Sequence, residues 1–273
     1  MQPRNDLHPI VSYMLYPRII PCLLVKDKGL VKTVNFRNPK YVGDPINAVK
    51  IFNEKEVDEL MVIDIDATIE KREPDYVMIE RLAAECRMPL CYGGGVTNSS
   101  QIEKIIQLGV EKVAISHAAI ENPSLVTEAA EKVGNQSVVV VLDVKKRILG
   151  GKYEVYTHNG QKGTGKNPLE MALLMEKSGA GEIVINSIDQ DGAMKGYDFT
   201  LIEKIRNSIK IPLTVLGGAG SLEDIGKLIH EYGSIGASAG SLFVFKGIFR
   251  AVLINYPNRV EKTKLISDFY PAS

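Results

Sequence analysis

Two glycine-rich turns, far apart in the chain, are the segments best suited to bind a ligand. Residues 89–96 read PLCYGGGV, and residues 212–219 read PLTVLGGA. Each apolar run stops at consecutive glycines, and each is followed by a polar turn and an amphipathic helical pattern. Free backbone N–H groups and the partial positive charge of a helix N-terminus together suit a phosphate. Two such turns predict a ligand that carries a phosphate at each end.

The elements that must position these turns also occur twice. Residues 64–66 (DID) match residues 187–189 (SID), and residues 24–26 (LVK) match residues 143–145 (DVK). The strand that follows each glycine turn ends in small residues, SHAA in one copy and AGS in the other. The period is far too long for a solenoid. It predicts two half-domains of four strand–helix units each.

Short β-branched runs alternate with longer helical patterns along the whole chain. Strands are expected at residues 18–25, 60–65, 89–93, 112–116, 137–143, 183–187, 212–216 and 235–239. Helices are expected at residues 45–55, 75–86, 99–108, 123–133, 167–178, 200–207 and 221–230. Eight strands that alternate with helices in a duplicated order favour a closed barrel over an open sheet. The predicted fold is α/β, a (β/α)8 TIM barrel built from two duplicated half-barrels.

The barrel is expected to occupy residues 18–255 of the 273. An N-terminal extension at 1–17 precedes it, and a C-terminal tail at 256–273 follows it. The longest connections follow the first strand (27–44) and the fifth strand (145–166). The second of these is rich in Gly, Lys and Tyr, which predicts a β-hairpin or a flap over the barrel.

Composition narrows the class of protein. Lys+Arg and Asp+Glu are equal at 33 each, so charge gives no argument for a nucleic-acid or membrane partner. Three cysteines, Cys22, Cys86 and Cys91, have no metal-ligand spacing and fit a reduced cytoplasm. No apolar run approaches the roughly 18 residues of a membrane span. We expect a cytoplasmic protein with no metal and no cofactor.

The active face of such a barrel lies at the C-terminal ends of its strands. Carboxylates, lysines and both glycine turns therefore converge on one rim. The residues expected there are Leu24, Lys26, Asp64, Asp66, Gly93, Gly94, Gly95, Ser116, Asp143, Lys145, Ser187, Asp189, Asp191, Gly192, Gly217, Gly218, Gly240 and Ser241.

The order of motifs resembles the cyclase subunit of imidazole glycerol phosphate synthase over about residues 18–250. The matching blocks are residues 18–23, 43–45, 57–60, 93–96, 111–113, 119–123, 153–158, 179–182, 189–192 and 217–221. The resemblance implies a heterodimer in which a glutaminase subunit docks on the N-terminal face of the barrel. Ammonia then crosses the barrel to the C-terminal face. There a bis-phosphate ribulosyl substrate is cleaved and cyclised to imidazole glycerol phosphate and an aminoimidazole carboxamide ribotide.

The resemblance also assigns roles to particular positions. It implies an ammonia gate of four charged residues, Arg18, Glu59, Lys112 and Glu182, which an ordinary ion-pair ring closing the barrel would equally explain. It places Glu111 at the glutaminase interface. It implies one phosphate site at Gly95 and Ser116, where Ser116 replaces an amide residue. The other phosphate site comprises Asp191, Gly192, Gly218, Gly240 and Ser241.

The main departure from the family pattern is on the first strand. The family has a carboxylate there, opposed to one on strand five, and the pair acts as general acid and base. This chain keeps Asp143 but has Leu24 at the partner position, as the internal repeat also shows. Losing a positioned acid or base typically costs about 10²–10⁴-fold in rate. Asp143 could act alone as a base or only pair with Lys145 or Lys26.

Three functions remain open at this point. The chain could be an active cyclase in histidine biosynthesis, with Asp64 or Asp66 replacing the missing carboxylate. It could be a non-cyclising paralogue that passes ammonia to a downstream amidotransferase making amidino sugars for bacterial surface polysaccharide (lipopolysaccharide). A single-chain sugar-phosphate isomerase would share the phosphate sites but leaves Arg18, Glu59, Lys112 and Glu182 unexplained.

Overall fold

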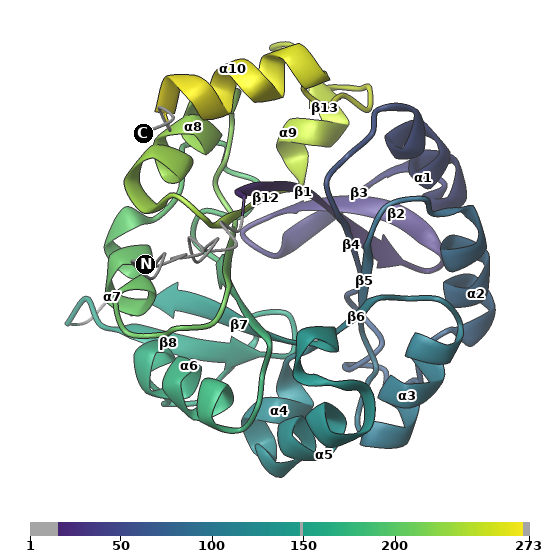
Figure 1. Cartoon of the computed structure of the whole chain (residues 1–273), viewed down its shortest axis with the longest axis vertical. Helices are drawn as coiled ribbons and strands as arrows, with labels where there is room; N and C mark the ends of the chain where they lie inside the picture. Colours follow the sequence, from purple (N-terminus) through teal and green to yellow (C-terminus); the bar gives the residue numbers. More distant parts are fainter. Residues whose placement is uncertain (1–15, 148–149, 270–273) are drawn as a thin grey trace, which may run out of the picture.

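A computed structural model describes residues 16–147 and 150–269 of the chain. Within them, eight parallel strands close into a barrel and helices surround it, as the view in Figure 1 shows. The predicted (β/α)8 barrel is therefore confirmed. Most of the N-terminal extension expected at 1–17 lies outside the described residues.

The barrel strands are neighbours in chain order, and β7 pairs with β10 across the intervening hairpin strands β8 and β9. Pairing of β12 with β1 closes the barrel. Their bounds are β1 Arg18–Lys26, β4 Leu60–Asp64, β5 Leu90–Gly93, β6 Lys112–Ile115, β7 Val138–Lys146, β10 Glu182–Ser187, β11 Leu213–Leu216 and β12 Gly236–Ala239. The first strand lies beside the last, with Arg18 paired with Gly236. Each strand agrees with the sequence expectation except that β7 runs on to Lys146.

Seven helices join the strands where the periodicity predicts them. They are α1 Pro45–Glu54, α2 Tyr76–Glu85, α3 Ser99–Gln107, α5 Ser124–Val133, α6 Pro168–Lys177, α7 Phe199–Arg206 and α8 Leu222–Tyr232. Several begin at a residue whose side chain caps the first turn; Asp44 accepts from the backbone N–H of Asn47, for example. The shorter helices α4 (His117–Glu121) and α9 (Ser241–Val244) and the 3-10 turn at Asn135–Ser137 were not expected.

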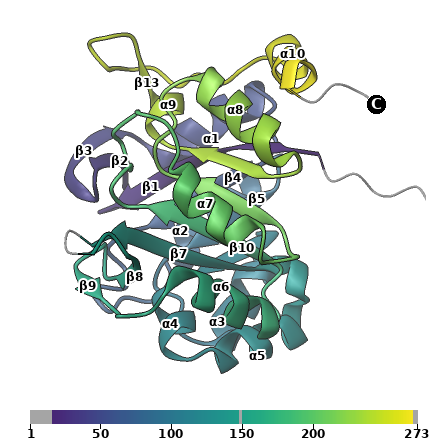
Figure 2. The same cartoon turned by 90° about the vertical axis from the view of Figure 1, so that its left-hand side faces the viewer.

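Three antiparallel hairpins extend from the C-terminal ends of the barrel strands (Figure 2). The first, β2 (Gly29–Val34) with β3 (Arg37–Gly43), occupies a segment that the sequence suggested was only a connection. The second joins β7 to β8 (Tyr153–Thr157) and β9 (Lys162–Gly163), where a hairpin was expected. The third pairs β13 (Phe245–Lys246) with β14 (Ala251–Val252).

The C-terminal segment forms a further helix, α10 (Arg259–Phe269), which lies against α8. Two side chains tie this region to the start of β1. The Tyr256 hydroxyl donates to the Ile19 carbonyl at 2.9 Å, and Lys262 contacts Asp58 at 2.7 Å. Asp58 in turn accepts from the Ile19 N–H at 2.9 Å.

The core has two layers because successive strand residues point to opposite faces. The outer cluster packs strands against helices and includes Leu23, Phe52 and Val62. The inner cluster fills the middle of the barrel. It consists of Ile20, Cys22, Met61, Cys91, Ala114, Val139, Val184 and Leu216, with Leu24, Ile63 and Val141 packed against it.

Candidate functional site

One pocket opens at the C-terminal end of the barrel, and both glycine turns line it. Gly94 and Gly218 occupy equivalent places, with φ of 123° and 119°. A Cβ on Gly94 would lie 2.5 Å from the Asp64 carbonyl oxygen, and one on Gly218 would lie 2.1 Å from that of Gly196. Both positions therefore require glycine, since other residues would be strained and would collide with backbone.

The residues assigned to phosphate binding all line this pocket. They form two groups, Gly95 and Ser116 in the first, and Asp191, Gly192, Gly218, Gly240 and Ser241 in the second. Lys26, Asp66, Lys145, Ser187 and Asp189, which were also expected at this rim, are not among the pocket-lining residues.

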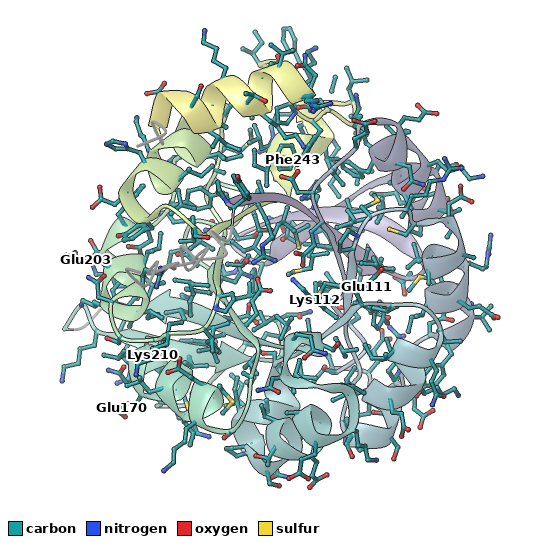
Figure 3. The ribbon with its side chains drawn as sticks, in the orientation of Figure 1. Glu111, Lys112, Glu170, Glu203, Lys210 and Phe243 are labelled. Carbon is teal, nitrogen blue, oxygen red and sulfur yellow. The ribbon has the colours of Figure 1, made fainter. Side chains whose placement is uncertain are left out.

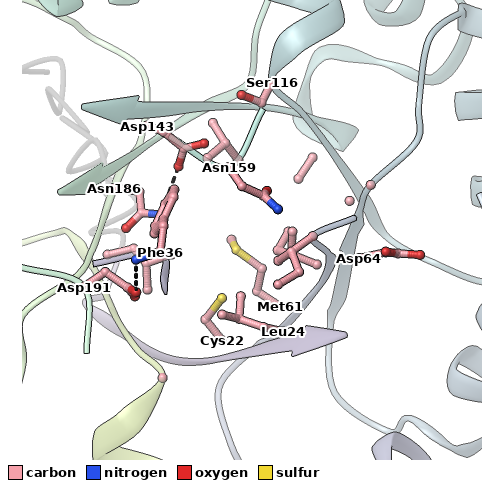
Figure 4. Close-up of a pocket in the computed structure, with 18 of the residues that line it drawn as sticks. Cys22, Leu24, Phe36, Met61, Asp64, Ser116, Asp143, Asn159, Asn186 and Asp191 are labelled. Carbon is pink, nitrogen blue, oxygen red and sulfur yellow. Dashed lines mark hydrogen bonds between the residues drawn. The ribbon is translucent and has the colours of Figure 1, made fainter. Parts of the chain in front are cut away.

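Asp143 is one of the carboxylates that line the pocket. It accepts a 3.0 Å hydrogen bond from the Asn186 side-chain amide, drawn in Figure 4. Burial raises the pKa of Asp143 to about 7, although the Asn186 bond opposes the rise. The pairing of Asp143 with Lys145 or Lys26 considered from the sequence is absent in the described residues. Lys26 pairs with Asp66, and Lys145 lies 5.7 Å from the centre of the Tyr156 ring.

Leu24 lies across the pocket from Asp143, beside Cys22 and Met61 (Figure 4). The two nearby carboxylates are engaged with cations. Asp64 points away from the pocket and binds Arg72 at 3.1 Å. Asp66 binds Lys26 and accepts from the Asn159 amide at 3.3 Å. Both carboxylates are held in ion pairs in this structure, which argues against either of them taking the place of the missing one.

A second acidic group faces the pocket with a different environment. Asp191 accepts from the Thr33 hydroxyl at 2.7 Å and from the Phe36 N–H at 3.4 Å. Burial raises its pKa, and these bonds and nearby Lys32 oppose the rise.

Lys32 is a pocket residue that the sequence gave no reason to select. It is buried on β2 and donates to the Cys22 carbonyl at 2.5 Å. Burial lowers its pKa. A Cβ on Gly240 would lie only 2.7 Å from the Lys32 amine. Glycine at position 240 therefore leaves space for this lysine beside the second group of residues assigned to phosphate binding.

His117 also lines the pocket, where its ring meets that of His158 with centroids 4.5 Å apart. Burial and the neighbouring His158 lower the pKa of His117, which keeps the imidazole neutral near pH 7.

The opposite end of the barrel carries four charged side chains in a closed ring. Arg18 contacts Glu59 and lies 2.8 Å from Glu182, while Lys112 lies 2.9 Å from each glutamate. Lys112 points toward the barrel axis, whereas Glu170, Glu203 and Lys210 lie at the periphery (Figure 3). The ring therefore lies across the N-terminal end of the inner core.

Electrostatic pairing dominates within this ring. Burial alone would raise the pKa of Glu182, but Arg18 and Lys112 hold it at about 2. Burial also opposes the charge on Lys112, yet Glu182 and Glu59 outweigh it and raise its pKa. The Thr214 hydroxyl adds a 2.5 Å bond to Glu182. Thr214 is a fifth member of the ring. The sequence analysis did not identify it, because a threonine within a strand gives no sign that its hydroxyl binds a buried carboxylate.

Known relatives match nearly the whole chain. The family model described as "Histidine biosynthesis protein" matches residues 18–250. "Putative imidazole glycerol phosphate synthase subunit hisF3" of Vibrio vulnificus is 57% identical over 94% of this chain and 98% of its own length. "Putative imidazole glycerol phosphate synthase subunit HisF" of Leptospira interrogans is 57% identical over 92% of this chain and 99% of its own length. "Imidazole glycerol phosphate synthase subunit HisF" of Hyphomonas neptunium is 42% identical over 85% and 91%.

The chain belongs to the HisF-like histidine biosynthesis family. This confirms the resemblance drawn from the motifs.

One further acidic residue, Glu111, lies next to the ring. Glu111 is exposed next to Lys112, and its carboxylate accepts from the Leu90 N–H at 2.8 Å. It therefore lies at the N-terminal end of the barrel, on the face that carries the ring.

No helix in residues 16–147 and 150–269 has the length and hydropathy to span a bilayer. Nor does that part of the chain gather His, Cys, Asp or Glu side chains into a group that could hold a metal ion.

Proposed function

We propose that this chain is the ammonia-using subunit of a glutamine-dependent complex. A glutaminase docks at the ring end, near Glu111, and forms a heterodimer. Ammonia passes the ring of Arg18, Glu59, Lys112 and Glu182 and crosses the inner core. It reaches the pocket, where a phosphorylated substrate is bound between the two glycine turns.

The observation that carries this proposal is that the ring and the pocket lie at opposite ends of one apolar interior. The layer between them consists of side chains such as Ile20, Cys22 and Val184, and it offers an ion nothing to replace its water. Neutral ammonia can cross such a layer at small cost, whereas ammonium would lose its hydration. The ring thus suits a gate that admits the neutral molecule.

The pocket supports chemistry on a phosphorylated substrate. Gly94 and Gly218 line the pocket in the two glycine turns, and Lys32 adds an amine beside Gly240. The pKa of Asp143, at about 7, suits a group that both accepts and returns a proton. By family, the reaction would be lyase and cyclase chemistry on a bis-phosphate ribulosyl substrate, in the manner of imidazole glycerol phosphate synthase.

Leu24 favours a second candidate within the same framework. A leucine cannot transfer a proton, and the two neighbouring aspartates are engaged in ion pairs. The complex would then generate ammonia and pass it to a separate amidotransferase, of the kind that installs amidino groups on bacterial surface sugars. The ring and the interior serve this function equally well, and only the cyclisation is lost.

The gate is tested with Lys112→Met, which keeps the bulk of the side chain and removes its charge. In the complex with the glutaminase, glutamine-driven activity should fall at least about tenfold, because breaking a buried ion pair costs more than the energy of a tenfold change. Ammonium-driven activity should be retained. Lys210→Met, on the periphery, is the matched control. Equal losses with glutamine and with ammonium salt would show that the ring serves stability alone.

A further inference from the structure

The tip of the β13–β14 hairpin exposes large apolar side chains to solvent. Ile248 and Phe249 are each 90% exposed, and Leu253, just after β14, is 52% exposed. We refer to residues 245–253 as the tip hairpin. Adjacent apolar side chains held in water on a protruding turn are unusual for a surface without a partner.

The tip hairpin adjoins the mouth of the pocket. It follows directly from α9, whose first residue, Ser241, lines the pocket. Arg250 reaches back to the carbonyl of Gly192, another lining residue, at 3.4 Å. Lys40 on β3 lies 5.7 Å from the centre of the Phe245 ring, which links the tip hairpin to the β2–β3 hairpin. Figure 2 shows both hairpins on the side where the barrel strands end.

The two segments that contain these hairpins have a pronounced charge bias. The chain as a whole is balanced, yet residues 28–43 and 232–260 contain no Asp or Glu. They contribute Lys246 on β13 and Lys40 and Arg250 beside Phe245, with Arg37 further along β3. Such a surface is complementary to a protein face that is acidic with an apolar centre.

We propose that the tip hairpin, with the adjacent edge of β3, is a docking surface for the enzyme that consumes the ammonia. The inference rests on the second candidate function, in which a separate enzyme consumes the ammonia. Ammonia released into water at neutral pH becomes ammonium, which has no lone pair for attack on carbon. An acceptor enzyme must therefore cover the pocket mouth, and a surface built into its rim meets that need.

A second copy of this chain is a poorer occupant of the surface. A two-fold contact centred on the tip hairpin would place the same cations opposite one another. Like charges brought together across an interface cost several kcal/mol. The charge bias therefore selects an acidic protein of a different kind.

The test uses the full chain in complex with its glutaminase, and as probe a purified amidotransferase that uses ammonia to install amidino groups on sugars. Phe249→Ser combined with Ile248→Ser should weaken binding of that enzyme at least tenfold and abolish glutamine-driven product. Product formed from ammonium salt should not change. Val77→Ser, an exposed apolar residue on α2, is the matched control and should leave both unchanged. Raising the salt concentration should weaken wild-type binding.

The outcomes separate this inference from the proposed function. If the wild-type complex couples glutamine to product and the double variant does so equally well, the docking surface is overturned and the proposed function stands. If the wild-type complex delivers no ammonia to a separate acceptor enzyme, the docking surface and the second candidate function are both overturned, and cyclase chemistry in the chain's own pocket stands. If the double variant loses self-association while acceptor binding stays intact, the tip hairpin is instead a contact with a second copy. If it loses binding to anionic phosphatidylserine vesicles while acceptor binding stays intact, the tip hairpin is instead a membrane contact.

Discussion

The two ends of the barrel interior treat a buried carboxylate in opposite ways. At the ring, Glu182 is surrounded by two cations and a hydroxyl, and its pKa is about 2. At the pocket, Asp143 has one neutral amide as its partner, and its pKa is about 7. Burial acts on both in the same direction. The number of charged partners therefore decides whether the group serves as a fixed charge or as a proton carrier.

The largest expected effect comes from unbalancing the ring. Glu182→Gln leaves Arg18 and Lys112 sharing one carboxylate in a buried place. Breaking a buried ion pair on one side typically costs about 3–5 kcal/mol. Urea unfolding should show a loss of that size. Glu203→Gln, on the outer surface of α7, should change stability by less than about 0.5 kcal/mol. A loss no larger than that of the control would mean that the ring is not electrostatically coupled.

Restoring the missing partner should sharpen the contrast at the pocket. Leu24→Asp supplies a second carboxylate opposite Asp143 and should raise cyclase turnover with ammonium salt by about 10²-fold. The measurement is steady-state turnover of the bis-phosphate ribulosyl substrate. Leu24→Asn has a similar shape but transfers no proton, and it should give no gain. Robust wild-type turnover that Asp143→Asn does not reduce would show that other groups perform the chemistry.

The two carboxylates should also give opposite dependences of stability on pH. Asp143 has a raised pKa in the folded protein, so its ionisation costs stability as pH rises from about 4 to about 7. Asp143→Asn should therefore be more stable than wild type at pH 8, by about 2 kcal/mol once screening by pocket water is allowed for, and equal to it near pH 4. Urea unfolding at both pH values checks this. An Asn variant that is less stable at pH 8 would show that the charged form is favoured.

Glu182 should show the reverse trend. Its pKa is lowered in the folded protein, so its contribution is present above about 4.5 and is lost as pH falls toward 2. Below about pH 4, the stability of the wild type should fall more steeply than that of Glu182→Gln. Parallel curves would contradict the assignment of the low pKa to the ring.

The smallest expected effect concerns the hydroxyl at the ring. Thr214→Val keeps the shape and removes the hydrogen bond to Glu182, which should cost about 1 kcal/mol. Thr127→Val removes an exposed hydroxyl bond to the Ser178 carbonyl and should cost less. Equal melting temperatures for Thr214→Val and wild type would show that the two cations alone satisfy Glu182.

Much of the fold could be predicted because its signals are local. Apolar runs, capping residues and paired glycines gave the eight strands and seven helices within a few residues. The β2–β3 hairpin was missed because its turn is made by Asn35 and Phe36, both at positive φ, and a Phe there gives no turn signal. The helix α10 did have a signal: Asn258 and Glu261 cap each other through their side chains.

The site was less predictable, for a physical reason. Asp143 and Leu24 stood out because the internal repeat aligns them. Lys32 did not, since its partner is a backbone carbonyl on another strand, and only the folded barrel brings the two together. The engagement of Asp64 by Arg72 likewise depends on a loop conformation that periodicity does not encode.

The pairing of β1 with β12 also affects how the protein is made. One edge of the first strand can be completed only by a strand close to the C-terminus, and Tyr256 and Lys262 secure the start of β1 from still later in the chain. During synthesis, β1 therefore leaves the ribosome long before its final neighbour exists. Unpaired strand edges are templates for pairing with other chains. The free edge of β1 is thus open to misassembly until β12 has been synthesised.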